Sequence, residues 1–157
     1  MLRICRLLLF SCLLVACDNN EFERVEITDP LHGTWNLLNE QGGDFSPINI
    51  DYEPGEKTWT FNSISGVMTI TDNLNPNYAC ALCNSSRDYI VTENDTGSSS
   101  IGSELIKWVE YSEDGSINGT IIIGGITSLS ETELIVTSHN VAPLIWTLTK
   151  AEEDLFN

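Results

Sequence analysis

Apolar and polar residues alternate along most of this chain, and this alternation constrains the fold more than any other feature. In Lys57–Asn62 (KTWTFN), for example, the large apolar side chains stand at every second position. Successive side chains of a strand point to opposite faces of a sheet, so such a stretch has one apolar face. Clusters of Gly, Asn, Asp, Ser and Pro separate these stretches, and no dozen residues show a helical period. The sequence therefore predicts an all-β domain of short antiparallel strands.

Eight strands are expected after Leu31. They are Gly33–Leu38, Lys57–Asn62, Gly66–Thr71, Arg87–Thr92, Ser103–Tyr111, Ser116–Gly124, Glu133–Ser138 and Leu144–Lys150. The long connection after the first strand could form a further short strand around Ile48–Ile50. Six strands each place two large side chains on one face, which we assign to the core: Trp35 and Leu37, Trp59 and Phe61, Met68 and Ile70, Tyr89 and Val91, Leu134 and Val136, Trp146 and Leu148. In Ser103–Tyr111 both faces carry apolar residues, and we favour Ile106 and Trp108 as the inward pair.

The order and spacing of these strands favour an eight-stranded antiparallel up-and-down barrel, because closing the sheet on itself removes its exposed edges. A β-sandwich of two sheets is the alternative, since it has the same local pattern. The interior of an eight-stranded barrel is either filled by side chains or open enough for one small ligand.

The amino-terminal residues indicate a targeting signal. Arg3 and Arg6 precede ten uncharged residues, Leu7–Ala16, which are too few to cross a bilayer and typical of a secretory signal. The sequence Leu14–Cys17 (LVAC) then resembles the lipobox of bacterial lipoproteins. That resemblance implies a signal peptide over residues 1–16, lipidation of Cys17, an acidic tether over residues 17–30 and a domain over residues 31–157. An ordinary secretory signal that happens to contain Cys is the alternative.

Lipidation would make the membrane a partner and place the protein in the bacterial cell envelope. The outer membrane or cell surface is favoured, and the inner membrane stays open, because acidic residues after a lipidated Cys resemble both an export tag and a retention signal. The chain has a net charge of −16, and loss of the signal leaves five Lys and Arg against 23 Asp and Glu, or −18. Such a charge repels nucleic acid, which we exclude as a partner.

The triplet Gly33-Thr34-Trp35 opens the first predicted strand and resembles the Gly-x-Trp signature of lipocalins. In that family the Trp covers the closed end of the barrel and packs against a basic side chain near the end of the last strand. Lys150 is the matching residue here, although lipocalins more often carry Arg. The resemblance thus implies barrel-base packing by Gly33, Trp35 and Lys150. The alternative is that Trp35 is an ordinary core aromatic beside a solvated Lys150.

The same resemblance implies a ligand cavity that opens at the other end of the barrel, beneath the connections 39–56 and 72–86. The expected ligand is a small apolar molecule. The candidate cavity residues are Trp59, Phe61, Met68, Tyr89 and Trp108, which could equally fill the barrel.

Cys80 and Cys83 would be the two cysteines left after processing and lipidation. In an oxidising envelope a close pair is most simply a disulfide. A redox Cys-x-x-Cys would need a helix amino terminus, and a structural metal would need more ligands. We expect no metal and no cofactor.

No catalytic motif is present, and the barrel places His32 and His139 at opposite ends. Two functions remain ahead of an enzyme. The first is a lipid-anchored, lipocalin-like protein that binds a small hydrophobic ligand. The second is a non-enzymatic envelope interaction or accessory protein with a filled barrel and a protein partner.

Overall fold

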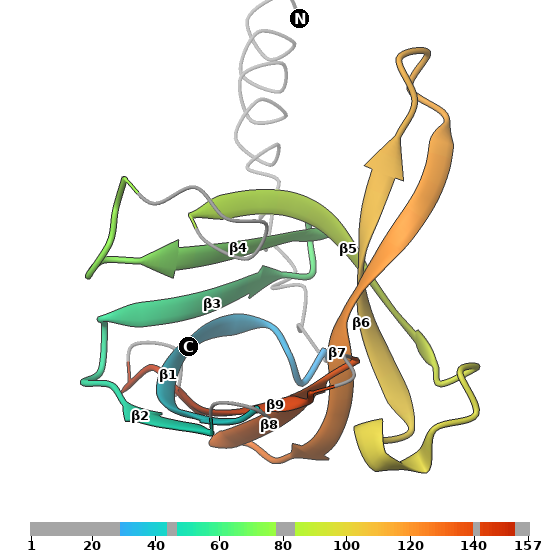
Figure 1. Ribbon diagram of the computed structural model, residues 1–157. Helices are drawn as coiled ribbons and strands as arrows, with labels where there is room; N and C mark the ends of the chain where they lie inside the picture. Colours follow the sequence, from blue (N-terminus) through green and yellow to red (C-terminus); the bar gives the residue numbers. More distant parts are fainter. Residues whose placement is uncertain (1–28, 44–46, 78–83, 140–141, 153–157) are drawn as a thin grey trace, which may run out of the picture.

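A single antiparallel sheet closes into a barrel (Figure 1). The computed structural model describes residues 29–43, 47–77, 84–139 and 142–152. The described strands are β1 (Gly33–Gly42), β2 (Ile48–Asp51), β3 (Lys57–Asn62), β4 (Val67–Asp72), β5 (Ser85–Glu93), β6 (Glu104–Tyr111), β7 (Ile117–Leu129), β8 (Glu133–Ser138) and β9 (Leu144–Lys150). They pair in the order β2-β1-β3-β4-β5-β6-β7-β8-β9, and β1 also pairs with β9. That last pairing closes an eight-stranded, lipocalin-like barrel and excludes the two-sheet sandwich.

Strand β1 is longer than predicted because it has three neighbours. Its first residues pair with β3, its last residues pair with β2, and its other edge pairs with β9 from Trp35 to Gly42. The apolar alternation ends at Leu37, and the polar residues that begin at Asn39 are held by these backbone ladders. The short strand around Ile48–Ile50 is present as β2.

Strand β7 was predicted to end at Gly124 but continues to Leu129. The two glycines in its middle are needed for close packing. A Cβ on Gly125 would collide with the carbonyl oxygen of Ile101, in the short 3₁₀ helix η2 (Ser99–Ile101). A Cβ on Gly124 would lie 2.7 Å from the carbonyl oxygen of Thr137. These glycines therefore allow backbone approach within a continuous strand.

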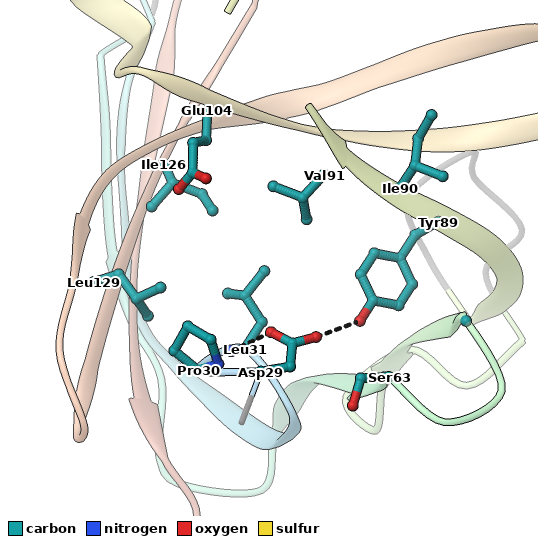
Figure 2. Close-up of a pocket in the computed structure, with 11 residues that line it drawn as sticks. Asp29, Pro30, Leu31, Ser63, Tyr89, Ile90, Val91, Glu104, Ile126 and Leu129 are labelled. Carbon is teal, nitrogen blue, oxygen red and sulfur yellow. Dashed lines mark hydrogen bonds between the residues drawn. The ribbon is translucent and has the colours of Figure 1, made fainter. Parts of the chain in front are cut away.

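The core draws on all eight strands of the barrel. The predicted inward pairs are buried, with one exception: Val91 is 37% exposed although its neighbour Tyr89 is buried. Val91 shares the face of Tyr89 but lies closer to an end of the barrel, where the interior is open (Figure 2). In β6 the favoured Ile106 and Trp108 belong to the core, and Leu105 and Val109 are also buried, outside that cluster.

We name the two ends of the barrel by Trp35. The Trp35 end is where β1 begins and β9 finishes, and it holds the β3–β4 turn, the β5–β6 loop and the β7–β8 turn. The far end holds the β1–β2, β4–β5, β6–β7 and β8–β9 connections. The predicted signal peptide, lipidated Cys17, the tether up to residue 28, and Cys80 and Cys83 lie outside the described residues.

Strands β6 and β7 extend past the far end as a two-stranded ribbon that projects from the barrel (Figure 1). Strand β8 pairs with β7 only from Gly124 onward, and β5 pairs with β6 only as far as Trp108. The ribbon exposes Tyr111 and Ile117, and Ile121 is also exposed beside it.

Candidate functional site

The Gly-x-Trp triplet forms the packing at the Trp35 end. Trp35 is fully buried, and its indole N–H donates a hydrogen bond to the carbonyl oxygen of Leu31 at 2.8 Å. The Nζ atom of Lys150 lies 5.3 Å from the centroid of the Trp35 ring, and the two residues are direct partners in the β1–β9 ladder. Gly33 has a φ of +112°, a conformation that side chains disfavour. The contact expected between Trp35 and Lys150 is thus present.

The barrel interior is filled by aromatic side chains where the sequence allowed for a cavity. Trp59 lies 5.3 Å from Trp146 between ring centroids, and Phe61 lies 5.4 Å from Tyr89. Phe61, Met68 and Trp108 are at most 1% exposed. Of the five candidate cavity residues Trp59, Phe61, Met68, Tyr89 and Trp108, only Tyr89 lines the pocket at the Trp35 end. The other four belong to one buried core cluster.

A pocket of about 340 Å³ opens at the Trp35 end, opposite the end where the sequence placed it (Figure 2). Its lining comes from the segment before β1, the β3–β4 turn and strands β5, β6 and β7. The lining residues are Asp29, Pro30, Leu31, Ser63, Gly66, Tyr89, Ile90, Val91, Glu104, Ile126 and Leu129. Leu31 covers Trp35 and also forms one wall of the pocket, so the packing that closes the base leaves a space beside it.

Asp29 and Tyr89 form a polar pair on one side of the pocket. One Asp29 carboxylate oxygen accepts the N–H of Leu31 at 2.9 Å, and the other accepts the Tyr89 hydroxyl at 3.4 Å. Burial, followed by the charge of Asp29 and this hydrogen bond, raises the pKa of Tyr89 to about 12. The Tyr89 hydroxyl therefore keeps its proton at neutral pH and acts as a donor to Asp29.

The β3–β4 turn supports this side of the pocket. The backbone N–H of Ser63 donates to His32 Nδ1 at 3.2 Å, and the Ser63 hydroxyl lies 2.9 Å from the same nitrogen. The carbonyl oxygen of Gly66 accepts the N–H of Tyr89 at 2.9 Å. Gly66 has a φ of +70°, so glycine suits the turn at this position. These bonds hold the β3–β4 turn against the segment before β1 and against β5.

Glu104 stands at another part of the pocket rim, at the start of β6. Its partner across the ladder is Glu93 of β5, so two acidic residues lie directly opposite each other. Among the described residues, no side chain forms a hydrogen bond or ion pair with the Glu104 carboxylate. The pocket lining contains no basic residue.

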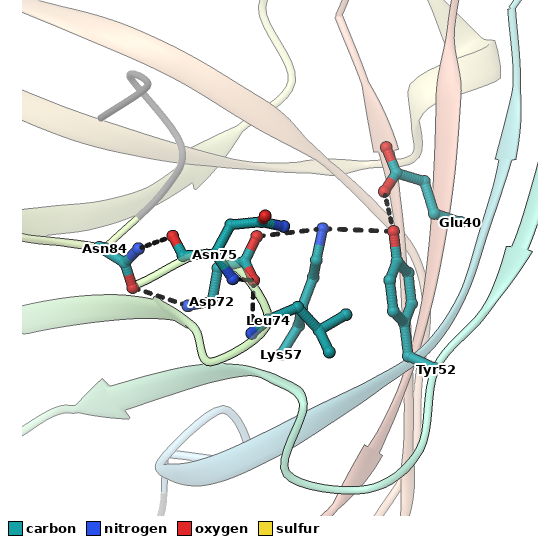
Figure 3. Close-up of polar contacts among 7 residues, drawn as sticks. All are labelled: Glu40, Tyr52, Lys57, Asp72, Leu74, Asn75 and Asn84. Carbon is teal, nitrogen blue, oxygen red and sulfur yellow. Dashed lines mark hydrogen bonds and ion pairs between the residues drawn. The ribbon is translucent and has the colours of Figure 1, made fainter. Parts of the chain in front are cut away.

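A separate polar network lies toward the far end (Figure 3). Lys57 is at its centre: Nζ is 3.4 Å from an Asp72 carboxylate oxygen and donates to the Tyr52 hydroxyl at 3.2 Å. Tyr52 in turn donates to Glu40 at 3.1 Å. The network links β1, β3 and β4, and its groups are engaged with one another. Its arrangement is suited to holding the strands together.

The buried Asp72 carboxylate is stabilised in its charged form. Burial alone would raise its pKa, but the N–H of Asn75, the ammonium of Lys57 and the N–H of Leu74 outweigh this effect. The pKa of Asp72 therefore lies below its usual value of 3.8. The N–H groups of Leu74 and Asn75 donate to one oxygen at 3.0 and 2.9 Å, which also orders the start of the β4–β5 connection.

The described residues place the two histidines at opposite ends of the barrel and gather no metal-binding group of side chains. No three His, Cys, Asp or Glu side chains in the described ranges gather where they could hold a metal ion. His32 precedes β1 at the Trp35 end, and His139 follows β8 at the far end. In the same part of the chain, no helix has the length and apolar character required to span a bilayer.

Most pocket residues have no local sequence pattern that marks them as part of a site. The polar pattern places Asp29 and Pro30 in the tether, and a strand that ends at Gly124 leaves Leu129 in a loop, whereas the structure places all three in the pocket lining. One sequence signal does point to Leu129. Apolar residues, Ile126 and Leu129, continue after the paired glycines and indicate that the strand continues past them. Comparison with protein-family models, with curated proteins and with solved structures gave no significant match to this chain.

Proposed function

We propose that this protein is a lipid-anchored, lipocalin-like protein of the bacterial cell envelope that binds a small hydrophobic ligand at the Trp35 end of its barrel. The pocket there is the observation that carries the proposal. Its volume of about 340 Å³ falls within the range of small-molecule sites. Leu31, Val91 and Ile126 supply apolar walls, and Tyr89 with Asp29 supplies a fixed polar group. This combination is typical of sites that orient a mostly apolar ligand.

The attachment to a membrane rests on the Arg3 and Arg6 charges, the apolar run Leu7–Ala16 and the lipobox-like residues up to Cys17. Eleven residues separate Cys17 from Asp29, a pocket residue. Even fully extended, this length of chain reaches only about 40 Å. A lipid on Cys17 would therefore keep the pocket close to the membrane surface, with the outer membrane or the cell surface as the favoured location.

A titration with Nile red, a neutral apolar dye, tests ligand binding. The protein used is Asp18–Asn157, which contains every strand of the closed barrel, with circular dichroism to verify the β fold. We expect saturable fluorescence enhancement. Val91→Trp should abolish it by filling the pocket, whereas Ile117→Trp, on the projecting ribbon, should not. Absence of binding, or unchanged binding to the Val91→Trp variant, would refute the proposed pocket function.

Fractionation of cells that express the full chain tests the anchor. Cys17→Ala should move the protein from the membrane fraction to the soluble fraction, because the acylated thiol is lost. Cys12→Ala, inside the apolar run of the signal, is the matched control and should leave the protein in the membrane fraction. Membrane association that survives Cys17→Ala would exclude lipidation at this residue.

The second candidate function is a non-enzymatic envelope interaction protein with a protein partner. It is favoured by the filled interior and by the exposed apolar side chains of the ribbon, where Ile117 is 68% exposed. Replacement of Ile117 and Ile121 by Ser would then abolish cross-linking to the partner in cells, while Nile red binding would be unchanged. If ligand binding is the only function, these two changes should alter neither cross-linking nor Nile red binding.

A further inference from the structure

We infer that the ligand of the Trp35-end pocket is a cationic amphiphile, with a primary amine as its head and an apolar tail. This inference rests on the proposed ligand-binding function and specifies the class of ligand. Asp29 and Glu104 are the charged residues of the pocket lining. Figure 2 shows both carboxylates directed toward the space between the apolar side chains. A ligand with a carboxylate head would be repelled by this lining.

The charges around Glu104 are not compensated within the described barrel. Glu93 is its direct partner in the β5–β6 ladder, and like charges at such positions destabilise a sheet. The described residues contain four Lys and Arg, all engaged elsewhere. Lys57 pairs with Asp72, Arg87 lies over Trp108, Lys107 pairs with Asp95, and Lys150 lies over Trp35. A cationic ligand would supply the charge that the barrel itself lacks at this rim.

The hydrogen-bonding groups of the pocket also suit an ammonium. An ammonium has three N–H donors and no acceptor, whereas a carboxylate only accepts. Each Asp29 oxygen accepts one protein hydrogen bond and retains a further lone pair. The Tyr89 hydroxyl donates its only proton to Asp29. Its oxygen can therefore accept a hydrogen bond from the ligand but cannot donate one. Asp29, Tyr89 and Glu104 therefore present acceptors, and Val91, Ile126 and Leu129 remain for the tail.

Displacement of Nile red by three eight-carbon compounds tests the inference, because octylamine, octanol and octanoate share a tail and differ in charge. At pH 7 octylamine should displace the dye at a concentration about tenfold lower than octanol, because the exposed Glu104 carboxylate and the partly buried Asp29 carboxylate each add the contribution of an exposed ion pair. Octanoate should be the weakest competitor. High salt should raise the octylamine concentration needed for displacement toward that of octanol, and the octanol concentration needed should stay the same.

Isosteric variants identify the carboxylates responsible. Glu104→Gln and Asp29→Asn should each raise the octylamine concentration needed to displace Nile red about twofold to fivefold. The octanol concentration needed should stay the same. Glu110→Gln, on the same strand as Glu104 but outside the pocket lining, is the matched control and should change neither competitor.

The displacement experiments distinguish failure of the cationic-ligand inference from failure of the proposed ligand-binding function. If octanoate competes as well as octylamine, or if Glu104→Gln and Asp29→Asn leave octylamine unaffected, the cationic ligand is refuted while the pocket function stands. If Nile red itself does not bind, both are refuted.

Discussion

At the residue scale, the contact between Trp35 and Lys150 shows how a short motif acquires a structural role. The indole is buried in the base of the barrel, its N–H is satisfied by Leu31, and its ring carries the Lys150 ammonium at 5.3 Å. Lys is a point charge on a flexible stem, whereas Arg would stack a planar group on the same ring. The base of the barrel therefore has a cation over the Trp35 ring without the planar stacking that Arg would add.

Replacement of the Lys150 charge should lower stability modestly. Lys150→Met keeps most of the apolar stem and removes the cation, so we expect a loss of about 0.5–1 kcal/mol in the free energy of unfolding. Urea denaturation measures it. Lys150→Arg should retain or increase the wild-type value, and equal losses for Met and Arg would contradict a cation–π contribution.

Asp72 should make stability depend on acid pH. Its folded pKa is depressed below 3.8, so the folded state binds fewer protons than the unfolded state as the carboxyl titrates. The stability that the carboxylate contributes is fully present above the unfolded pKa and is lost as the pH falls through the folded pKa. Asp72→Asn should thus cost about 1.5–3 kcal/mol at pH 7, the range for hydrogen bonds to charged groups.

Urea denaturation of wild type and Asp72→Asn at several pH values provides the measurement. The difference between the two proteins should shrink as the pH falls below 3.8, because the unfolded wild type then gains a proton, and it should be lost below the folded pKa, where both proteins carry a neutral side chain. Glu131→Gln, at an exposed position in the β7–β8 turn, is the control and should stay close to wild type at pH 7. A difference that persists unchanged into strong acid would show that the Asp72 charge is not the cause.

At the element scale, β7 shows that paired glycines need not end a strand. Gly124 and Gly125 continue the ladder with both β6 and β8, and the missing side chains admit the backbone of η2 and of β8. Strand β7 can therefore carry Ile126 and Leu129 to the Trp35 end, where they form part of the pocket wall. The shape of the pocket depends on this close packing.

Gly125→Ala should destabilise the barrel, because the new methyl group would collide with the carbonyl oxygen of Ile101. Overpacking of this kind costs about 1–3 kcal/mol, which thermal denaturation would detect. The control is Gly119→Ala on the same strand, where the nearest atom to a Cβ would be a Glu110 oxygen at 3.8 Å. Similar stability for the two variants would mean that η2 does not pack tightly on β7.

At the scale of the whole molecule, repulsion among negative charges opposes folding of the barrel. The chain carries a net charge of −16, and the described residues contain two ion pairs, Lys57–Asp72 and Lys107–Asp95. Closure through β1 and β9 brings all the strands, and the carboxylates on them, into one compact body. Self-repulsion should therefore oppose the folded state more than the expanded unfolded chain.

Salt should stabilise the protein as a consequence. An increase from about 20 to about 500 mM NaCl shortens the screening length several-fold and weakens this repulsion. We expect a rise in Tm of about 2–8 °C, equivalent to about 1 kcal/mol. Glu131→Lys should raise Tm in low salt and reduce the salt effect. A Tm that falls with added salt would show that attractive ion pairs outweigh the repulsion.

The sequence by itself determined the strands and most inward faces. Trp59 with Phe61 and Trp146 with Leu148 mark strands whose bounds the structure reproduces, because the period of two is a local property of the chain. The Trp35–Lys150 contact was also within reach, since up-and-down connectivity brings the first and last strands together at one end.

Only the tertiary structure decided where the barrel is filled and where it is open. Aromatic residues such as Phe61 and Trp108 have the same pattern whether they line a cavity or fill it, and their mutual packing is what fills it. Asp29, Glu104 and Leu129 carry no local signal of a shared site. They meet because closure of the sheet brings distant parts of the chain to one end, and that proximity is a property of the closed barrel alone.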